Sequence, residues 1–256
     1  MKRVCIIGAT RGLGRALVDL YASQPNTVVY GTARRDPPKE HTESVRWLSN
    51  IDVSRENAGT EILDQYGRDE PLDVLYVTAG YFATESFDKP KWEDEVKTYT
   101  ISAIGPVFLI HHLVHGNVLK KGTKIVLISS EAGSIGLRHE KEGGGNFSHH
   151  ASKAALNMVG KLLSMDLKDR GIVVSLVHPG FMRTDMTKGV GYDKYWDVGG
   201  AVTPDVAAKT LAEWTDKLDM SKTGQLWAPR GAKDIGTAGE TMGPKDELPT
   251  PLQLPW

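Results

Sequence analysis

The sequence predicts an α/β protein: a single domain built on a doubly wound, Rossmann-type parallel sheet of about seven strands. Two observations carry this prediction. Short apolar, β-branched runs alternate with helical patterns along most of the 256 residues, which is typical of a parallel sheet covered by helices on both faces. The first apolar run, residues 4–7, breaks into Gly8, Gly12 and Gly14 and then into a helical pattern. That order indicates a strand, a glycine turn and a helix.

Composition limits the classes of function. The chain is 40% hydrophobic and 25% charged, as expected of one globular domain over residues 1–256. Its formal net charge of -1 gives no reason to expect nucleic acid or an anionic membrane as a partner. Cys5 is the only cysteine, and no apolar run approaches the roughly 18 residues of a membrane span. We therefore expect a cytoplasmic protein with a small-molecule substrate and no targeting peptide.

The other elements follow in chain order. The glycine turn leads into a helix over about 12–23. Further strands are expected at 27–32, 45–49, 73–77, 124–130, 172–177 and about 225–228, and further helices at about 54–66, 91–116, 148–170 and 204–218. Residues 131–147 form a loop rich in charge and glycine, which is typical of a functional loop. Residues 185–203 resemble a substrate lid, and residues 240–256 form a proline-rich tail.

The glycine turn predicts a dinucleotide site. Without Cβ atoms, the turn lets backbone N–H groups at a helix N-terminus face a pyrophosphate. The residues expected to line this site are Gly8, Thr10, Arg11, Gly12, Leu13 and Gly14. The alternative is a purely structural turn.

The residues after the second strand predict which cofactor is bound. A carboxylate at this place serves the ribose hydroxyls of NAD, whereas an arginine accommodates the 2′-phosphate of NADP. Here Arg34 and Arg35 follow the strand, and Arg11 lies in the glycine turn. Arg11 and Arg34 therefore favour NADP(H). Alternatively, Arg34 and Arg35 are solvated loop charges.

The glycine spacing G-x-x-x-G-x-G resembles that of the short-chain dehydrogenase/reductase family. The resemblance covers nearly the whole chain, because a serine, a lysine and a Pro-Gly pair follow in the family's order. It implies that Asp52 lies at the adenine edge of the cofactor, although Asp52 could equally cap the helix at 54–66. It also implies cofactor contacts by Ala79, Gly80, Lys153, Pro179, Gly180 and Thr184.

The catalytic positions depart from the family pattern. The family uses a tyrosine four residues before a lysine to exchange a proton, with a serine and an asparagine as helpers. Ser130 and Lys153 match this pattern, but His149 stands at the tyrosine position and Ser102 at the asparagine position. A histidine can exchange a proton near neutral pH, although the Lys153 ammonium would favour its neutral form. We expect catalysis by Ser130, His149 and Lys153.

Further candidates lie beside His149. His150, and His139, Glu140 and Glu142 of the preceding loop, could also carry charge or a proton. These residues lack the spacing of a zincin helix, so no metal is expected.

The departures leave three functions open. The first is an NADP(H)-dependent reductase or dehydrogenase acting on a carbonyl or alcohol. The second is a non-redox dehydratase, isomerase or cyclase that uses His149 as acid or base. The third is an NADP(H)-binding protein without catalysis.

The lid and the tail bear on the substrate. Met186, Tyr192, Tyr195 and Trp196 of the lid suggest a bulky, partly apolar substrate, or else these side chains only pack the lid onto its own domain. A resemblance to fungal-type reductases implies a role in secondary metabolism. The family's habit of pairing its long helices implies a homo-oligomer, either a dimer or a tetramer.

Overall fold

The computed structural model describes residues 1–39 and 45–256, and within these ranges eight strands form one sheet in the order β3-β2-β1-β4-β5-β6-β7-β8. The strands are β1 (Lys2–Ile7), β2 (Thr27–Thr32), β3 (Val45–Leu48), β4 (Val74–Val77), β5 (Lys124–Ile128), β6 (Val173–Val177), β7 (Leu226–Ala228) and β8 (Leu252–Gln253). Every neighbouring pair from β3 to β7 is parallel, and β8 pairs antiparallel with β7. The predicted doubly wound parallel sheet is confirmed, with β8 as an addition.

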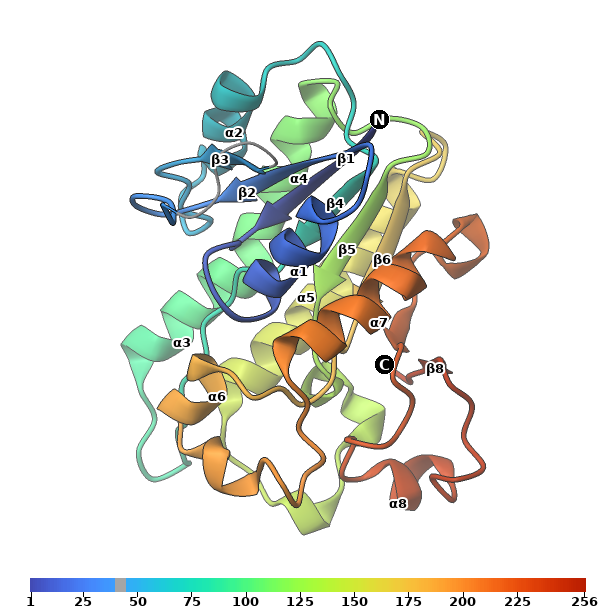
Figure 1. The fold of residues 1–256 in the computed structure, drawn as a ribbon. Helices are drawn as coiled ribbons and strands as arrows, with labels where there is room; N and C mark the ends of the chain where they lie inside the picture. Colours follow the sequence, from blue (N-terminus) through green and yellow to red (C-terminus); the bar gives the residue numbers. More distant parts are fainter. Residues whose placement is uncertain (40–44) are drawn as a thin grey trace.

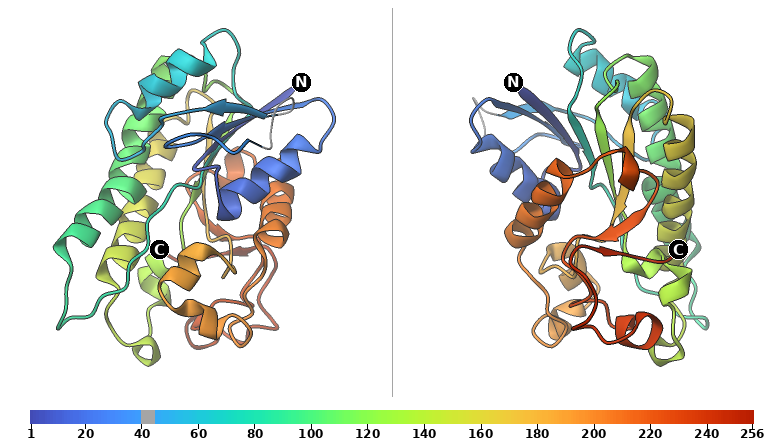
Figure 2. Two further views of the ribbon diagram at one scale, coloured as in Figure 1. Left: turned by 60° about the vertical axis from the view of Figure 1, so that its left-hand side comes forward. Right: turned by 90° about the vertical axis from the view of Figure 1, so that its right-hand side faces the viewer.

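Helices cover both faces of this sheet (Figure 1). They are α1 (Gly12–Ala22), α2 (Ala58–Tyr66), α3 (Trp92–Tyr99), α4 (Gly105–His115), α5 (Phe147–Asp166), α6 (Asp185–Gly189), α7 (Pro204–Asp216) and α8 (Ala238–Met242). Figure 2 shows α1 and α7 on one face, with α2, α4 and α5 on the other. The alternation along β1 explains the two cores: Val4 and Ile6 pack with α1 and α7, whereas Cys5 and Ile7 pack with α2, α4 and α5.

The helix expected over 91–116 is interrupted. A π-helical stretch, Thr100–Ile104, separates α3 from α4. At the start of α4, a Cβ on Gly105 would lie 2.2 Å from the backbone oxygen of Val53, so the helix approaches the loop after β3 closely. Such π-helical stretches are rare and short, so the apolar pattern of this segment predicts one continuous α-helix.

The helix expected at 54–66 begins later, at Ala58, with Asn57 as its N-cap. The interpretation of Asp52 as the cap of this helix is therefore wrong. The Asp52 carboxylate instead accepts the backbone N–H of Ser54 at 3.0 Å, in the short turn that an aspartate forms with its own following residues.

The proline-rich tail folds back on the domain. It contains part of α8 and all of β8, and Leu252 and Leu254 are buried in the core. The Ser134 hydroxyl donates to the backbone oxygen of Pro255 at 2.7 Å, and the Gly136 N–H donates to that of Trp256 at 2.8 Å. The tail therefore supports the loop that follows β5.

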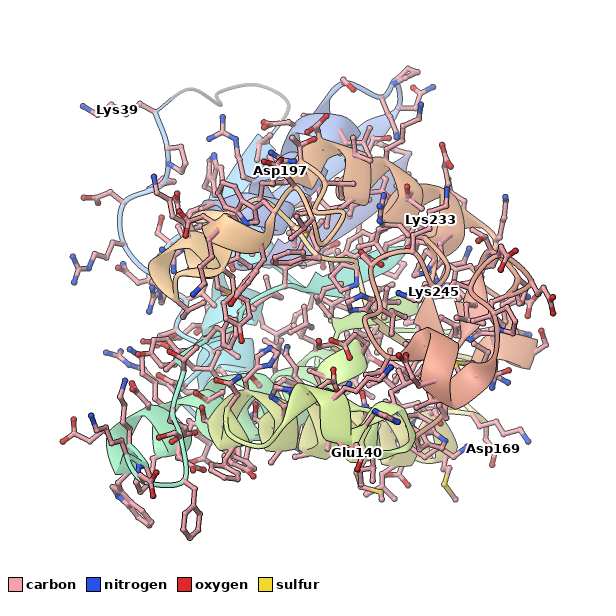
Figure 3. The ribbon with its side chains drawn as sticks, turned by 90° about the horizontal axis from the view of Figure 1, so that it is seen from below. Lys39, Glu140, Asp169, Asp197, Lys233 and Lys245 are labelled. Carbon is pink, nitrogen blue, oxygen red and sulfur yellow. The ribbon has the colours of Figure 1, made fainter. Side chains whose placement is uncertain are left out.

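The loops after β5 and β6 come together with α6 and α8 in the lower half of Figure 1. Figure 3 views this end from below and labels Asp197 in the 185–203 segment, Glu140 in the β5–α5 loop and Lys233 between β7 and α8. Segments far apart in sequence thus surround one end of the sheet. None of the helices in the described ranges has the length and apolar character needed to cross a membrane.

Candidate functional site

One cleft of about 1160 Å³ lies at this end of the sheet. Its wall includes all the residues expected from the sequence to bind cofactor or to catalyse: Gly8, Thr10, Arg11, Gly12, Leu13, Gly14, Arg34, Asp52, Ala79, Gly80, Ser130, His149, Lys153, Pro179, Gly180 and Thr184. They come from the loops at the carboxyl ends of β1 to β6 and from the first turns of α1 and α5, and ligands bind at this end of doubly wound sheets. Their individual roles stay predictions.

The glycine turn is shaped by close backbone packing. Gly8 has a φ of 84°, and a Cβ there would lie 2.8 Å from the backbone nitrogen of Ala79. A Cβ on Gly14 would lie 2.2 Å from the backbone oxygen of Gly8. Arg11 is the N-cap residue of α1. Its side chain makes no capping hydrogen bond with the described residues. The N–H groups in the first turn of α1 are thus available to an anion in the cleft.

Charged side chains gather at the end of the cleft after β2. Arg34, Arg35, Asp36, Asp52 and Arg55 all line it. Burial alone would raise the pKa of Asp52. Hydrogen bonds from Ser54 and the charges of Arg34 and Arg55 outweigh burial, so the pKa of Asp52 is lowered. Because Arg34 is exposed, its guanidinium is accessible to a ligand.

Lys153 and His149 stand one turn apart on α5, as their spacing predicts. The Lys153 ammonium donates to the backbone oxygen of Ile128 at 2.7 Å. Burial lowers the pKa of Lys153 to about 8. Burial, followed by the charge of Lys153, lowers the pKa of His149 to about 3. At pH 7 the pair is therefore a neutral imidazole beside a mostly charged ammonium.

The His149 ring is held by an aromatic neighbour. It packs against Phe82 with ring centroids 4.2 Å apart and an interplanar angle of 37°. Its Nδ1 atom is buried and makes no hydrogen bond with the described residues. Phe82, which follows β4, lines the cleft as well. Sequence reasoning missed this residue, since nothing in its local pattern links it to α5.

Ser130 caps a short 3-10 turn, Glu131–Gly133, by accepting the Ala132 N–H at 3.1 Å. Ser130 and His149 both line the cleft, but they make no hydrogen bond with each other in the described part of the chain. Ser102 lies in the π-helical stretch, and its hydroxyl is buried without a hydrogen-bond partner in the described residues. Ser102 does not line the cleft.

The start of α5 depends on a residue from another loop. The helix's own N-cap, Asn146, has a left-handed backbone and makes no side-chain cap with the described residues. The Glu85 carboxylate accepts the Ser148 N–H at 2.6 Å and the Lys91 N–H at 3.0 Å. These hydrogen bonds lower the pKa of Glu85 although burial opposes them. Glu85 therefore sets the first turn of α5, and with it His149.

The 185–203 segment covers one side of the cleft. Tyr192 and Tyr195 line the cleft, and the Tyr192 hydroxyl accepts the Asn146 side-chain N–H at 3.2 Å. Trp196 instead donates to the Thr187 hydroxyl at 3.2 Å, so it packs the segment onto itself. Thr184 is the N-cap of α6 and accepts the Thr187 N–H at 3.3 Å.

The charged residues of the β5–α5 loop hold the loop together. His139 caps the 3-10 turn Glu140–Glu142. Arg138 pairs with Glu131 and, at 3.0 Å, with Glu142. In the described part of the chain, no three His, Cys, Asp or Glu side chains are arranged to hold a metal ion.

Comparisons place this chain among known proteins. The sequence profile of the short chain dehydrogenase family matches residues 2–194. An uncharacterized oxidoreductase of Saccharomyces cerevisiae is 28% identical over 251 residues, which cover 90% of this chain and 96% of the yeast protein.

Two solved carbonyl reductases have a similar fold. The NADPH-bound carbonyl reductase from chicken fatty liver has a TM-score of 0.75 at 24% identity, covering 89% of this chain and 96% of its own. Carbonyl reductase Sniffer of D. melanogaster has a TM-score of 0.74 at 21% identity, and the likeness covers 100% of both chains.

Proposed function

Because the chain belongs to the short chain dehydrogenase family of oxidoreductases, we propose that it uses NADP(H) to reduce a carbonyl group of a bulky, partly apolar small molecule, or to oxidise the corresponding alcohol. The observation that carries the proposal is the continuity of the cleft. It joins the glycine turn and Arg34 to Ser130, His149 and Lys153. A dinucleotide bound along it would bring its nicotinamide to the titratable residues.

The residues of the cleft fit NADP(H). Without Cβ atoms, Gly8 and Gly14 let the turn pack closely against Ala79 and against its own backbone, and the N–H groups of α1 supply hydrogen bonds to a pyrophosphate. Arg11 and Arg34 would hold a 2′-phosphate through charge-assisted hydrogen bonds. The NADPH in the chicken carbonyl reductase supports this choice. When bound, the cofactor supplies or takes up the hydride.

The side chains on the other side of the cleft would manage the substrate oxygen and its proton. With a pKa of about 3, His149 is neutral at pH 7, so it can donate a hydrogen bond or accept a proton but carries no second proton to release. Lys153, with a pKa of about 8, is mostly an ammonium at this pH and can supply a proton. The Ser130 hydroxyl would hold the substrate oxygen.

The neutral His149 also favours a second candidate function. A neutral imidazole has one ring nitrogen free to accept a proton, although a pKa of about 3 makes His149 a weak base in this structure. The same cleft could then support a dehydratase, isomerase or cyclase reaction in which NADP(H) is bound without turnover. This candidate keeps His149 as the base and needs no donor in place of the family's tyrosine.

One experiment separates the two candidates. The protein is incubated with NADPH and a panel of bulky aromatic and alicyclic carbonyl compounds, and the absorbance of the reduced nicotinamide is followed while products are analysed by mass. Loss of absorbance coupled to alcohol formation supports the oxidoreductase. Conversion of a compound without loss of absorbance supports the non-redox enzyme, and binding of NADPH without conversion of any compound contradicts both.

The proposal includes a homo-oligomer, either a dimer or a tetramer. Several exposed apolar side chains support it: Ile104 at the end of the π-helical stretch, Phe108 in α4, and Met158, Leu162 and Met165 along α5. The three on α5 have a spacing of four and three residues, so they share one face of the helix. An exposed apolar face of this kind on α5 supports association with another copy. A cytoplasmic location and a role in secondary metabolism complete the proposal.

A further inference from the structure

We propose that Asp234 is a positioning residue for the nicotinamide end of the cleft, where it fixes the backbone turn that follows β6. The inference rests on the proposed binding of NADP(H). Residues 178–184 connect β6 to α6, and Pro179 and Gly180 of this connection line the cleft. Asp234 reaches the turn from the segment between β7 and α8 and lines the same cleft.

The contact between Asp234 and the turn is direct. Asp234 Oδ2 accepts the backbone N–H of Phe181 at 2.6 Å. Gly180 has a φ of 103°, and a Cβ there would lie 2.7 Å from Asp234 Oδ2 and 2.8 Å from Arg230 Nε. Any other residue at this position would both strain the backbone and collide with the Asp234–Arg230 pair. The shape of the Pro-Gly turn is therefore matched to the carboxylate behind it.

His178 connects Asp234 to the other loop of the reactive centre. Its Nδ1 accepts the backbone N–H of Glu131 at 3.2 Å, and its Nε2 lies 3.9 Å from Asp234 Oδ1. The His178 ring therefore lies between the two loops, and it lines the cleft as well. Through His178, Asp234 is connected to the residue that follows Ser130.

The carboxylate is held as a charged group inside the protein. The Asp234 side chain is completely buried, and Arg230 Nε lies 3.7 Å from its Oδ2. Burial raises the pKa of a carboxyl, but His178, the Phe181 N–H and Arg230 outweigh burial, and the pKa of Asp234 is lowered. Asp234 Oδ1, His178 Nε2 and Arg230 Nε are buried without hydrogen-bond partners in the described residues. Buried polar atoms without hydrogen-bond partners destabilise a fold, and they are typical of functional sites.

The segment that carries Asp234 is firmly anchored. Ala232 and Ile235 on either side of it are buried in the core. Further along, the Thr237 hydroxyl donates to the backbone oxygen of Leu137 at 2.7 Å. Asp234 is therefore presented from a fixed backbone and can act as a rigid acceptor for the turn.

The test compares two nucleotides that occupy different parts of the cleft. Equilibrium binding of NADPH and of adenosine 2′,5′-bisphosphate, which lacks the nicotinamide, is measured for the wild type and for Asp234→Ala, Asp234→Asn and Gly180→Ala. Glu240→Ala is the control, because Glu240 pairs with Lys141 outside the turn. We expect Asp234→Ala and Gly180→Ala to weaken NADPH binding by about 10- to 100-fold, as for loss of a charge-assisted hydrogen bond.

The bisphosphate should bind all the variants as it binds the wild type. Asp234→Asn keeps an acceptor for the Phe181 N–H, so it should recover most of the NADPH affinity. Equal weakening of both nucleotides would indicate general damage to the fold and overturn the positioning role, as would unchanged NADPH binding in Asp234→Ala and Gly180→Ala. If the wild type bound neither nucleotide, the cofactor assignment itself would be refuted, and the role of Asp234 with it.

Discussion

The rings of His149 and Phe82 lie 4.2 Å apart at the wall of the cleft, although their residues belong to α5 and to the loop after β4. The contact buries the imidazole beside an apolar ring, and burial is the larger cause of the low pKa of His149. The charge of Lys153 is the second cause, and the helical spacing of the two residues indicates that they are close. The protonation state of His149 is therefore set mainly by its burial in the folded chain.

This protonation state predicts an acid-sensitive fold. The pKa of His149 is about 3 in the folded protein and near 6.5 in an unfolded chain, so the unfolded state binds more protons between these values. Stability from this group is present above pH 6.5 and is lost as the pH falls toward 3. Between pH 7 and pH 5 the loss amounts to roughly 2 kcal/mol.

Urea denaturation at pH 7 and at pH 5 measures this loss. His149→Phe keeps a ring against Phe82 and removes the titrating group, so its free energy of unfolding should fall by roughly 2 kcal/mol less than that of the wild type over this interval. An identical decrease in both proteins would show that His149 is not the group responsible.

The cap of α5 provides a second prediction. Glu85→Ala leaves the buried Ser148 without its carboxylate acceptor, and loss of a helix cap costs about 0.5–2 kcal/mol. We expect urea denaturation to show a decrease of that size. Glu85→Gln, which keeps an acceptor oxygen, should lose less, and Glu56→Ala, at an exposed position, should lose nothing measurable. A Glu85→Ala protein as stable as the wild type would rule out the cap.

The sequence predicts those parts of the site that are encoded locally. Gly8, Gly12 and Gly14 are recognisable because the turn needs them within seven residues of one another, and Lys153 follows His149 by one helical turn. Glu85 and Asp234 are not recognisable, since they act on backbone N–H groups 63 and 53 residues away. Nothing in their own neighbourhoods distinguishes them from surface carboxylates, and only the folded chain brings Asp234 to the cleft and Glu85 to the start of α5.

The arginines at the end of the cleft after β2 predict cofactor preference. NADPH should bind at least tenfold more tightly than NADH, because Arg11 and Arg34 can pair with the 2′-phosphate and such bonds contribute about 1.5–3 kcal/mol each. Titration of both nucleotides measures the ratio. Arg34→Ala should reduce it, whereas Arg170→Ala, at an exposed position outside the cleft, should not. If Arg34→Ala kept the full preference for NADPH over NADH, Arg34 would not be part of the 2′-phosphate site.

The exposed apolar face of α5 predicts the oligomeric state. Leu162→Lys combined with Met158→Lys places two charges in the proposed interface, where unpaired charges oppose burial. Light scattering should show a dimer or tetramer for the wild type and a monomer for the double variant. Val198→Lys is the matched control, because Val198 is 85% exposed on the 185–203 segment. A monomeric wild type would contradict the proposed association.

His149 is the position where this chain and the family pattern differ most, and it gives the sharpest prediction for catalysis. If the imidazole acts on the substrate, His149→Phe should leave NADPH binding nearly unchanged and lower turnover by about 100-fold or more, the usual range for a positioned acid or base. The variant fills the same space against Phe82, so a packing role would leave turnover nearly intact. Binding and turnover must therefore be measured on the same preparation.

Restoring the family's residue with His149→Tyr then distinguishes the two proposed reactions. A phenol one helical turn from the Lys153 ammonium has its pKa lowered by the neighbouring charge and can protonate a substrate oxygen. A gain in carbonyl reduction would indicate a redox enzyme whose cleft accepts either donor. Loss of the native reaction without any such gain would favour the non-redox enzyme, because the reaction then depends on the imidazole and not on a proton donor to a carbonyl oxygen. Full activity of His149→Phe would move the proton transfer to another group, and His150, which also lines the cleft, is the first to test.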